Sequence, residues 1–166
     1  MTDELAAQLI RNLPGLSLAG SDSVKSPTRL MRTILIVDDS PTIRRMVKVA
    51  LTDIGEHGFT EAASGLEAIE QLTLAPPALM VLDLNMPDMH GIEVLTFLRR
   101  HPAYKALPVI VLTTRGDESS REAALHAGAT MYLTKPFVPS VLAGHARAAL
   151  NMPRLGEKTE SRRVER

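Results

Sequence analysis

From Thr33 onward, short runs of apolar residues alternate with longer segments in which apolar residues recur every three or four positions. Short continuous runs are typical of buried strands, and the longer period is typical of amphipathic helices. The expected strands cover residues 33–37, 58–62, 78–83, 108–113 and 130–134. The expected helices cover residues 41–54, 64–73, 91–100, 118–128 and 139–152. This alternation predicts an α/β fold, a doubly wound, five-stranded parallel sheet with helices on both faces.

Polar and apolar residues inside these segments give finer predictions. The run over 58–62 is the most polar of the strands and is expected at an edge of the sheet. A helix is expected to begin after Ser40 with a proline in its first turn, and another after Ser64. The helix after Ser64 is expected to bury Leu66, Ile69 and Leu72 on one face. We expect three methionines to fill gaps in the core: Met46, Met80 and Met131.

The two ends of the chain differ from this pattern. Residues 1–31 form an N-terminal extension or linker that contains a possible short helix over 3–13. Met31 directly precedes the first strong strand, so it is also a possible start of translation. The domain itself is expected over 32–152, and the charged tail over 153–166 is expected to be disordered.

Composition excludes several classes of function. The formal net charge is zero, so no basic excess indicates a nucleic-acid partner. There are no cysteines, which excludes disulfides and thiolate chemistry. No apolar run is long enough for membrane insertion, and Asp3 and Glu4 stand where a signal peptide would carry basic residues. We therefore expect a cytoplasmic protein.

Polar side chains gather at the carboxyl ends of the expected strands. Asp38 and Asp39 end the first strand, and Asp83 ends the third. Thr113 and Lys135 end the last two strands, and a parallel sheet brings all these ends to one edge. Mg²⁺ prefers carboxylate, carbonyl and phosphate oxygens, so this edge predicts a magnesium site. Asp39 and Asp83 are the expected direct ligands, with Asp38 acting directly or through water.

Four stretches in this order resemble the receiver domain of bacterial response regulators: "ILIVDDSPTIRRMV", "LMVLDLNMPDMHGIEVL", "VIVLTT" and "YLTKPF". The resemblance covers about residues 33–151 and is greatest to the stand-alone chemotaxis members, through Arg44, Arg45, Asn85 and Tyr132. It implies a flavodoxin-like (βα)5 fold with strand order 2-1-3-4-5.

The resemblance also implies a role for individual residues. Asp83 would accept a phosphoryl group from a histidine kinase or a histidine phosphotransfer protein, with Mg²⁺ as cofactor. Lys135 would supply positive charge to the acyl phosphate, and the following Lys135–Pro136 peptide bond would be cis. Thr113 and Tyr132 would act together as a switch.

Three residues beside that site bear on its chemistry. The main-chain carbonyl of Asn85 is a further expected magnesium ligand, since it lies two residues beyond Asp83. Thr114 and Arg115 depart from the common family pattern, in which a small residue follows the switch threonine. Arg115 and Asn85 flank the route of hydrolytic water.

These observations favour a single-domain response regulator that is not an enzyme beyond its own phosphorylation and dephosphorylation. Its downstream protein is expected to dock on the face made by helix 118–127, strand 130–134 and helix 139–151. Alternatives are a receiver fragment of a larger regulator or hybrid kinase, and an aspartyl-phosphate phosphohydrolase. The phosphohydrolase is disfavoured because Asp83 does not begin an Asp-x-Asp pair and no insertion is large enough for a cap domain.

Overall fold

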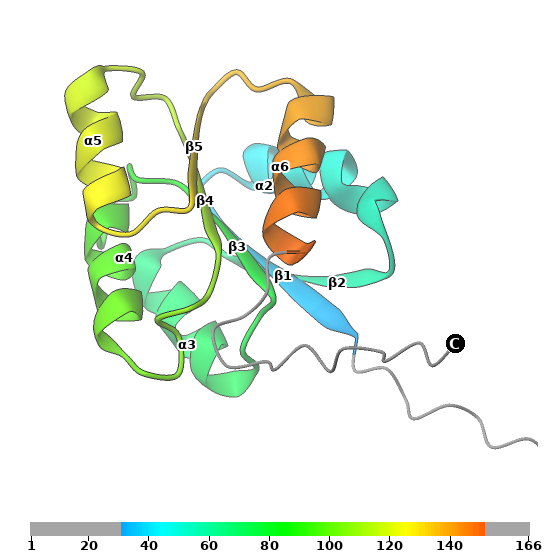
Figure 1. Ribbon diagram of the computed structural model, residues 1–166, viewed down its shortest axis with the longest axis horizontal. Coiled ribbons are helices and arrows are strands. Elements are labelled where there is room, and N and C mark those ends of the chain that lie inside the picture. Colours follow the sequence, from blue (N-terminus) through cyan, green and yellow to red (C-terminus); the bar gives the residue numbers. More distant parts are fainter. Residues whose placement is uncertain (1–30, 152–166) are drawn as a thin grey trace, which may run out of the picture. The chain divides into compact units, whose positions relative to one another are not determined.

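The computed structural model describes residues 31–151, and Figure 1 shows their arrangement. The predictions for the short helix over 3–13, the linker after it and the tail over 153–166 lie outside the described residues. The strands are β1 (Arg32–Val37), β2 (His57–Ala62), β3 (Leu79–Leu82), β4 (Val109–Thr113) and β5 (Met131–Thr134). The helices are α2 (Pro41–Leu51), η1 (Thr52–Ile54, a 3₁₀ turn), α3 (Gly65–Leu74), α4 (Gly91–Arg100), α5 (Glu118–His126) and α6 (Pro139–Asn151).

The five strands form one parallel sheet in the order β2-β1-β3-β4-β5, which confirms the predicted fold class and strand order. The polar strand β2 lies at the edge, as expected. Val37 of β1 pairs with Leu82 of β3. Because each of these residues is the last of its strand, the residues that follow them emerge side by side at one edge of the sheet.

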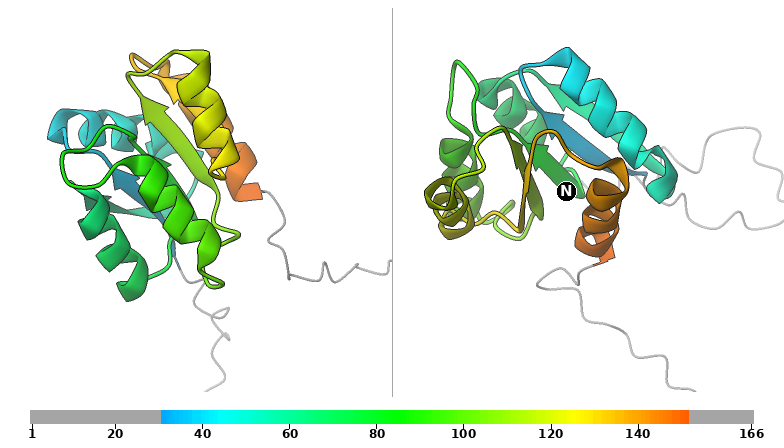
Figure 2. Two further views of the ribbon diagram at one scale, coloured as in Figure 1. Left: turned by 90° about the vertical axis from the view of Figure 1, so that its left-hand side faces the viewer. Right: turned by 90° about the horizontal axis from the view of Figure 1, so that it is seen from above.

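Helices cover both faces of the sheet, α2 and α6 on one face and α3, α4 and α5 on the other (Figures 1 and 2). The strands supply alternate residues to the two layers. Leu35 and Val37 pack against α3 and α4, whereas Ile34 and Ile36 pack against α2 and α6. This double burial explains why the central strands are continuously apolar. Within residues 31–151, no helix has the length and apolar character that crossing a membrane requires.

Caps fix where the helices begin and end. The Ser40 hydroxyl accepts the main-chain N–H of Ile43 at the start of α2, and the Ser64 hydroxyl accepts that of Glu67 at the start of α3. Beyond α5, Gly128 has a φ of +106°, a conformation that favours glycine. The predicted starts of α2 and α3 and the glycine stop after α5 are therefore confirmed.

Two expected core residues are exposed instead. Leu66 is 61% exposed because it lies at least about a third of a turn around α3 from the buried residues Ala68 and Leu72. Met46 is 48% exposed for the same reason, since α2 buries its neighbour Val47. Met80 is fully buried and Met131 is partly buried against the core, as predicted.

Candidate functional site

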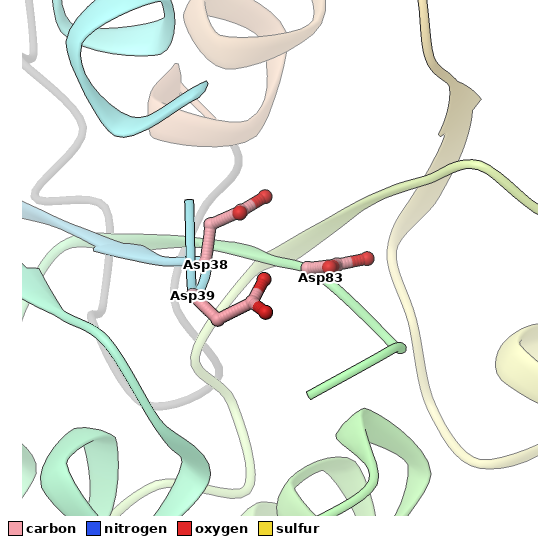
Figure 3. Close-up of side chains that lie close together, drawn as sticks. All are labelled: Asp38, Asp39 and Asp83. Carbon is pink, nitrogen blue, oxygen red and sulfur yellow. The ribbon is translucent and has the colours of Figure 1, made fainter. Parts of the chain in front are cut away.

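Three carboxylates meet where β1 and β3 end. Asp38 and Asp39 follow β1, and Asp83 follows β3, the neighbouring strand in the sheet. One oxygen atom from each carboxylate lies within 4.8 Å of the other two, and Figure 3 shows the three side chains extending in the same general direction. Asp38 and Asp83 are buried, whereas Asp39 is exposed. The structure thus brings together the three aspartates that were predicted from the strand ends.

Both carboxylate oxygens of Asp38 already have partners in the protein. Its Oδ1 accepts the main-chain N–H of Ser40 at 2.8 Å, and its Oδ2 lies 2.5 Å from Lys135 Nζ. Its main-chain carbonyl accepts Arg44 Nη1 at 2.8 Å. With both carboxylate oxygens engaged, Asp38 is less available for direct metal ligation than Asp39 and Asp83.

Arg44 belongs to an ion-pair cluster that sequence reasoning did not identify. Its Nε donates to Glu61 Oε2 at 2.9 Å, and Lys48 also pairs with Glu61. The hydrogen bond from Lys48, followed by that from Arg44, lowers the pKa of the Glu61 carboxyl. The only sequence signal was the spacing of Arg44 and Lys48, which are one helical turn apart on α2. The cluster joins α2 to the edge strand β2 and holds the turn that carries Asp38.

Lys135 links two of the carboxylates. Its Nζ lies 2.5 Å from Asp38 Oδ2 and 3.4 Å from Asp83 Oδ2. Its main-chain N–H donates to the Thr113 carbonyl, and the Lys135–Pro136 peptide bond is cis as the resemblance implied. The ammonium group therefore offsets part of the negative charge that the aspartates concentrate here.

Asp83 has one oxygen without a protein partner. Its Oδ1 is buried and accepts no hydrogen bond from the described residues 31–151. Burial raises the pKa of the Asp83 carboxyl above its ordinary value, and the nearby positive charge of Lys135 opposes that rise. An unpaired buried oxygen beside two other carboxylates has the donor chemistry of a Mg²⁺ site.

The predicted switch residues lie next to the carboxylates. Thr113 is fully buried at the end of β4, and its Oγ1 accepts Asn85 Nδ2 at 3.3 Å and the main-chain N–H of Arg115 at 3.4 Å. The Tyr132 hydroxyl donates to the Arg115 carbonyl at 2.6 Å. Burial, and then the charge of Asp117, raise the pKa of the Tyr132 phenol. Thr113 and Tyr132 are thus connected through the main chain of Arg115.

A cleft of about 500 Å³ opens over the carboxylates. Its walls contain most of the predicted site residues: Asp38, Asp39, Asp83, Asn85, Thr114, Lys135 and Pro136. Ser40, Ile43, Met46 and Phe137 also line it and were not predicted as site residues. Met46 therefore belongs to the cleft and not to the core. Thr113, Arg115 and Tyr132 are not among the lining residues and form the hydrogen-bonded group beside the cleft.

Comparison with known proteins shows the family of this chain. Residues 34–147 match the family described as "Response regulator receiver domain". The chain belongs to this family. It is 40% identical to the "Chemotaxis protein CheY homolog" of Campylobacter jejuni over 110 residues, which cover 66% of this chain and 85% of that relative.

Two further comparisons extend this result. The receiver domain is similar to the crystal structure of chemotaxis protein CheY4 from Vibrio cholerae, with a TM-score of 0.66 and 35% identity over 72% of this chain and 98% of that one. It is also 41% identical over 120 residues to the "Transcriptional regulatory protein KdpE" of Mycobacterium tuberculosis, covering 72% of this chain and 51% of that relative. Domains similar to this one therefore make up nearly all of some proteins and about half of a longer regulator.

Proposed function

We propose that this receiver domain, assigned to residues 32–152, is a single-domain response regulator. Asp83 accepts a phosphoryl group from a phosphohistidine on a histidine kinase or a histidine phosphotransfer protein. The observation that carries the proposal is that Asp83 Oδ1 has no partner within residues 31–151, while Asp83 lines a cleft with two further aspartates and Lys135. Chemotaxis signalling is the proposed setting, because CheY proteins are among the similar relatives and structures.

The reaction needs one new bond and the loss of another. An oxygen of the ionised Asp83 carboxylate attacks the phosphorus atom, the nitrogen–phosphorus bond of the donor breaks, and its electron pair returns to the imidazole. Lys135 Nζ, 3.4 Å from Asp83 Oδ2, stays within reach of the acyl phosphate and stabilises its charge. Such transfer depends mainly on positioning and on neutralising charge, so few further groups are required.

The Asp cluster fits Mg²⁺ as the cofactor of this reaction. Asp39 and Asp83 would hold the ion directly with the main-chain carbonyl of Asn85, and Asp38 would hold it directly or through water. A bound Mg²⁺ supplies positive charge that keeps the carboxylates ionised and offsets the charge of the phosphoryl oxygens. Asp38 would meanwhile keep Lys135 in place through their ion pair.

We further propose that phosphorylation is read out on the face formed by α5, β5 and α6. The phosphoryl group adds about −1.5 to −2 charges beside the buried Thr113 hydroxyl. Thr113 would move to donate to it, and Tyr132 on β5 would follow. The described hydrogen bonds support this route, because Arg115 contacts both residues. The downstream partner is a protein that docks on this face.

Transfer of phosphate from histidine kinases of the same genome tests the proposal. Each autophosphorylated kinase is mixed with wild type, Asp83→Asn or the control Asp53→Asn, with Mg²⁺ or with a chelator. We expect rapid Mg²⁺-dependent labelling of wild type and Asp53→Asn, and none of Asp83→Asn. Equal labelling of all three proteins, or labelling that survives the chelator, would contradict it.

A receiver module of a longer regulator is the second candidate, and the match to half of KdpE favours it. The full boundaries of the gene distinguish it from the single-domain protein. The site chemistry is the same in both. Family membership disfavours the aspartyl-phosphate phosphohydrolase, and the expected cytoplasmic location stays a prediction.

A further inference from the structure

Arg115 contacts three residues of the site through three different groups. Its main-chain N–H donates to Thr113 Oγ1, and its carbonyl accepts the Tyr132 hydroxyl. Its side-chain Nε donates to Asn85 Oδ1 at 3.1 Å. The first two contacts use the main chain and survive a change of side chain. Only the contact with Asn85 depends on the arginine.

That contact fixes the orientation of the Asn85 amide. A guanidinium group has donors and no acceptor, so it must face the oxygen of the amide and not the nitrogen. The amide nitrogen then points the other way and donates to Thr113 Oγ1 and Thr114 Oγ1, each at 3.3 Å. Arg115 thereby orients the Asn85 amide toward the switch threonine and connects the loop after β3 to the loop after β4.

This arrangement occupies the Thr113 hydroxyl in the unphosphorylated protein. Its oxygen has two lone pairs, and it accepts one hydrogen bond from Asn85 and one from the N–H of Arg115. Thr113 is fully buried while these donors are in place. Any movement of the hydroxyl toward a phosphoryl group on Asp83 therefore has to break them.

We propose that the Arg115 side chain is a positioning residue that opposes activation by holding Asn85 on Thr113. We call the chain of hydrogen bonds from Arg115 Nε through the Asn85 amide to Thr113 Oγ1 the Thr113 latch. The latch stabilises the resting arrangement and must open when Thr113 turns to the phosphoryl group. This inference rests on the proposed phosphorylation of Asp83.

The guanidinium charge favours activation, whereas the latch opposes it, and the experiment has to separate these two effects. Its positive charge attracts an anionic phosphoryl group, so Arg115→Ala removes both the attraction and the latch. Arg115→Gln removes the charge and keeps a donor nitrogen, which is separated from Cα by the same number of bonds as Nε. The difference between the two variants therefore isolates the latch. One hydrogen bond of this kind corresponds to about a two- to tenfold change in an equilibrium constant.

The experiment measures the affinity of the full chain for beryllofluoride, a phosphoryl mimic, in the presence of Mg²⁺. We expect Arg115→Ala to bind it about two- to tenfold more tightly than Arg115→Gln. The side-chain amide resonances of Asn85 should keep their wild-type shifts in Arg115→Gln and move in Arg115→Ala. Equal affinities, or tighter binding by Arg115→Gln, would overturn the latch.

Two further comparisons show whether the effect passes through Asn85. In an Asn85→Ala background the two Arg115 variants should bind equally, and a persisting difference would overturn the proposed route. Arg100→Ala removes an exposed arginine at the end of α4 and should keep wild-type affinity. If Arg100→Ala changes the affinity by as much as Arg115→Ala differs from Arg115→Gln, loss of a remote arginine has the same effect and the latch is wrong.

The proposed function can fail independently of the latch. Asp83→Asn should bind no beryllofluoride, and binding equal to wild type would refute Asp83 as the acceptor even if the Arg115 variants differ. Binding by wild type but not by Asp83→Asn, with equal affinities for Arg115→Ala and Arg115→Gln, would refute the latch alone. A wild type that does not bind would refute both.

Discussion

Asp83→Asn is predicted to make the metal-free protein more stable while abolishing phosphorylation. The substitution keeps the size and shape of the side chain and removes its charge. Two opposing Coulomb interactions disappear with that charge, the attraction to Lys135 and the repulsion from the neighbouring aspartates. What remains is the cost of burying the carboxylate charge, which is the largest cause of the raised pKa of Asp83. Function and stability are therefore in conflict at this position.

The distances show why the burial cost decides the sign. At 3.4 Å, the Asp83–Lys135 attraction is about 5 kcal/mol for an effective dielectric constant of about 20. At the 4.8 Å limit of the cluster, the repulsion from buried Asp38 is about 3.5 kcal/mol on the same basis. The exposed Asp39 adds about 1 kcal/mol in a water-like dielectric. These terms nearly cancel, so loss of the buried charge leaves an expected gain of about 1–3 kcal/mol for the variant.

Urea unfolding in the presence of a chelator measures this gain, with the exposed Asp53→Asn as control. The gain should depend on pH with a definite sign. Since burial raises the pKa of Asp83 in the folded state, ionisation destabilises wild type as pH rises through that pKa. The difference between Asp83→Asn and wild type should therefore be full at neutral pH and vanish below the ordinary aspartate range. An Asp83→Asn protein less stable than wild type at neutral pH would refute the reasoning.

Three other predictions follow from described contacts. Asp39→Asn should lose saturable Mg²⁺ binding in an NMR titration, and wild-type-like binding would exclude Asp39 as a ligand. Arg99→Ala should lower the free energy of unfolding by about 2–4 kcal/mol, because the half-buried guanidinium donates to three main-chain carbonyls; the exposed Arg100→Ala should change it by less than about 0.5 kcal/mol. Thr113→Ala should confine beryllofluoride-induced amide shifts to the cleft, whereas shifts that still reach Tyr132 would contradict the coupling route.

The fold was predictable because each central strand is buried on both faces. That burial makes strands such as β1 and β3 continuously apolar, and the acidic residues directly after them mark the strand ends. A parallel sheet then places Asp38, Asp39 and Asp83 together without any knowledge of side-chain conformation. The carboxylate cluster therefore followed from topology alone.

Other features depend on details that a residue pattern does not contain. Met46 and Leu66 are apolar residues outside the buried stripes of their helices, and the spacing of apolar residues alone does not show which of them face the core. The pairing of Lys135 with Asp38 depends on which carboxylate lies nearer its flexible side chain. The contact between Arg115 and Asn85 joins two loops whose paths are set by packing. Both loops were recognised from sequence, but their side-chain hydrogen bonds were not.

The central claim is that Asp83 carries the phosphoryl group, and mapping the acyl phosphate tests it most directly. The full chain is phosphorylated with acetyl phosphate and Mg²⁺, reduced with borohydride to mark the acyl-phosphate carbon, and digested for peptide mass spectrometry. The account predicts one marked residue, Asp83, and no marking when a chelator replaces Mg²⁺. A mark on Asp38 or Asp39, or an Asp83 peptide that stays unmodified while the protein gains phosphate, would contradict it.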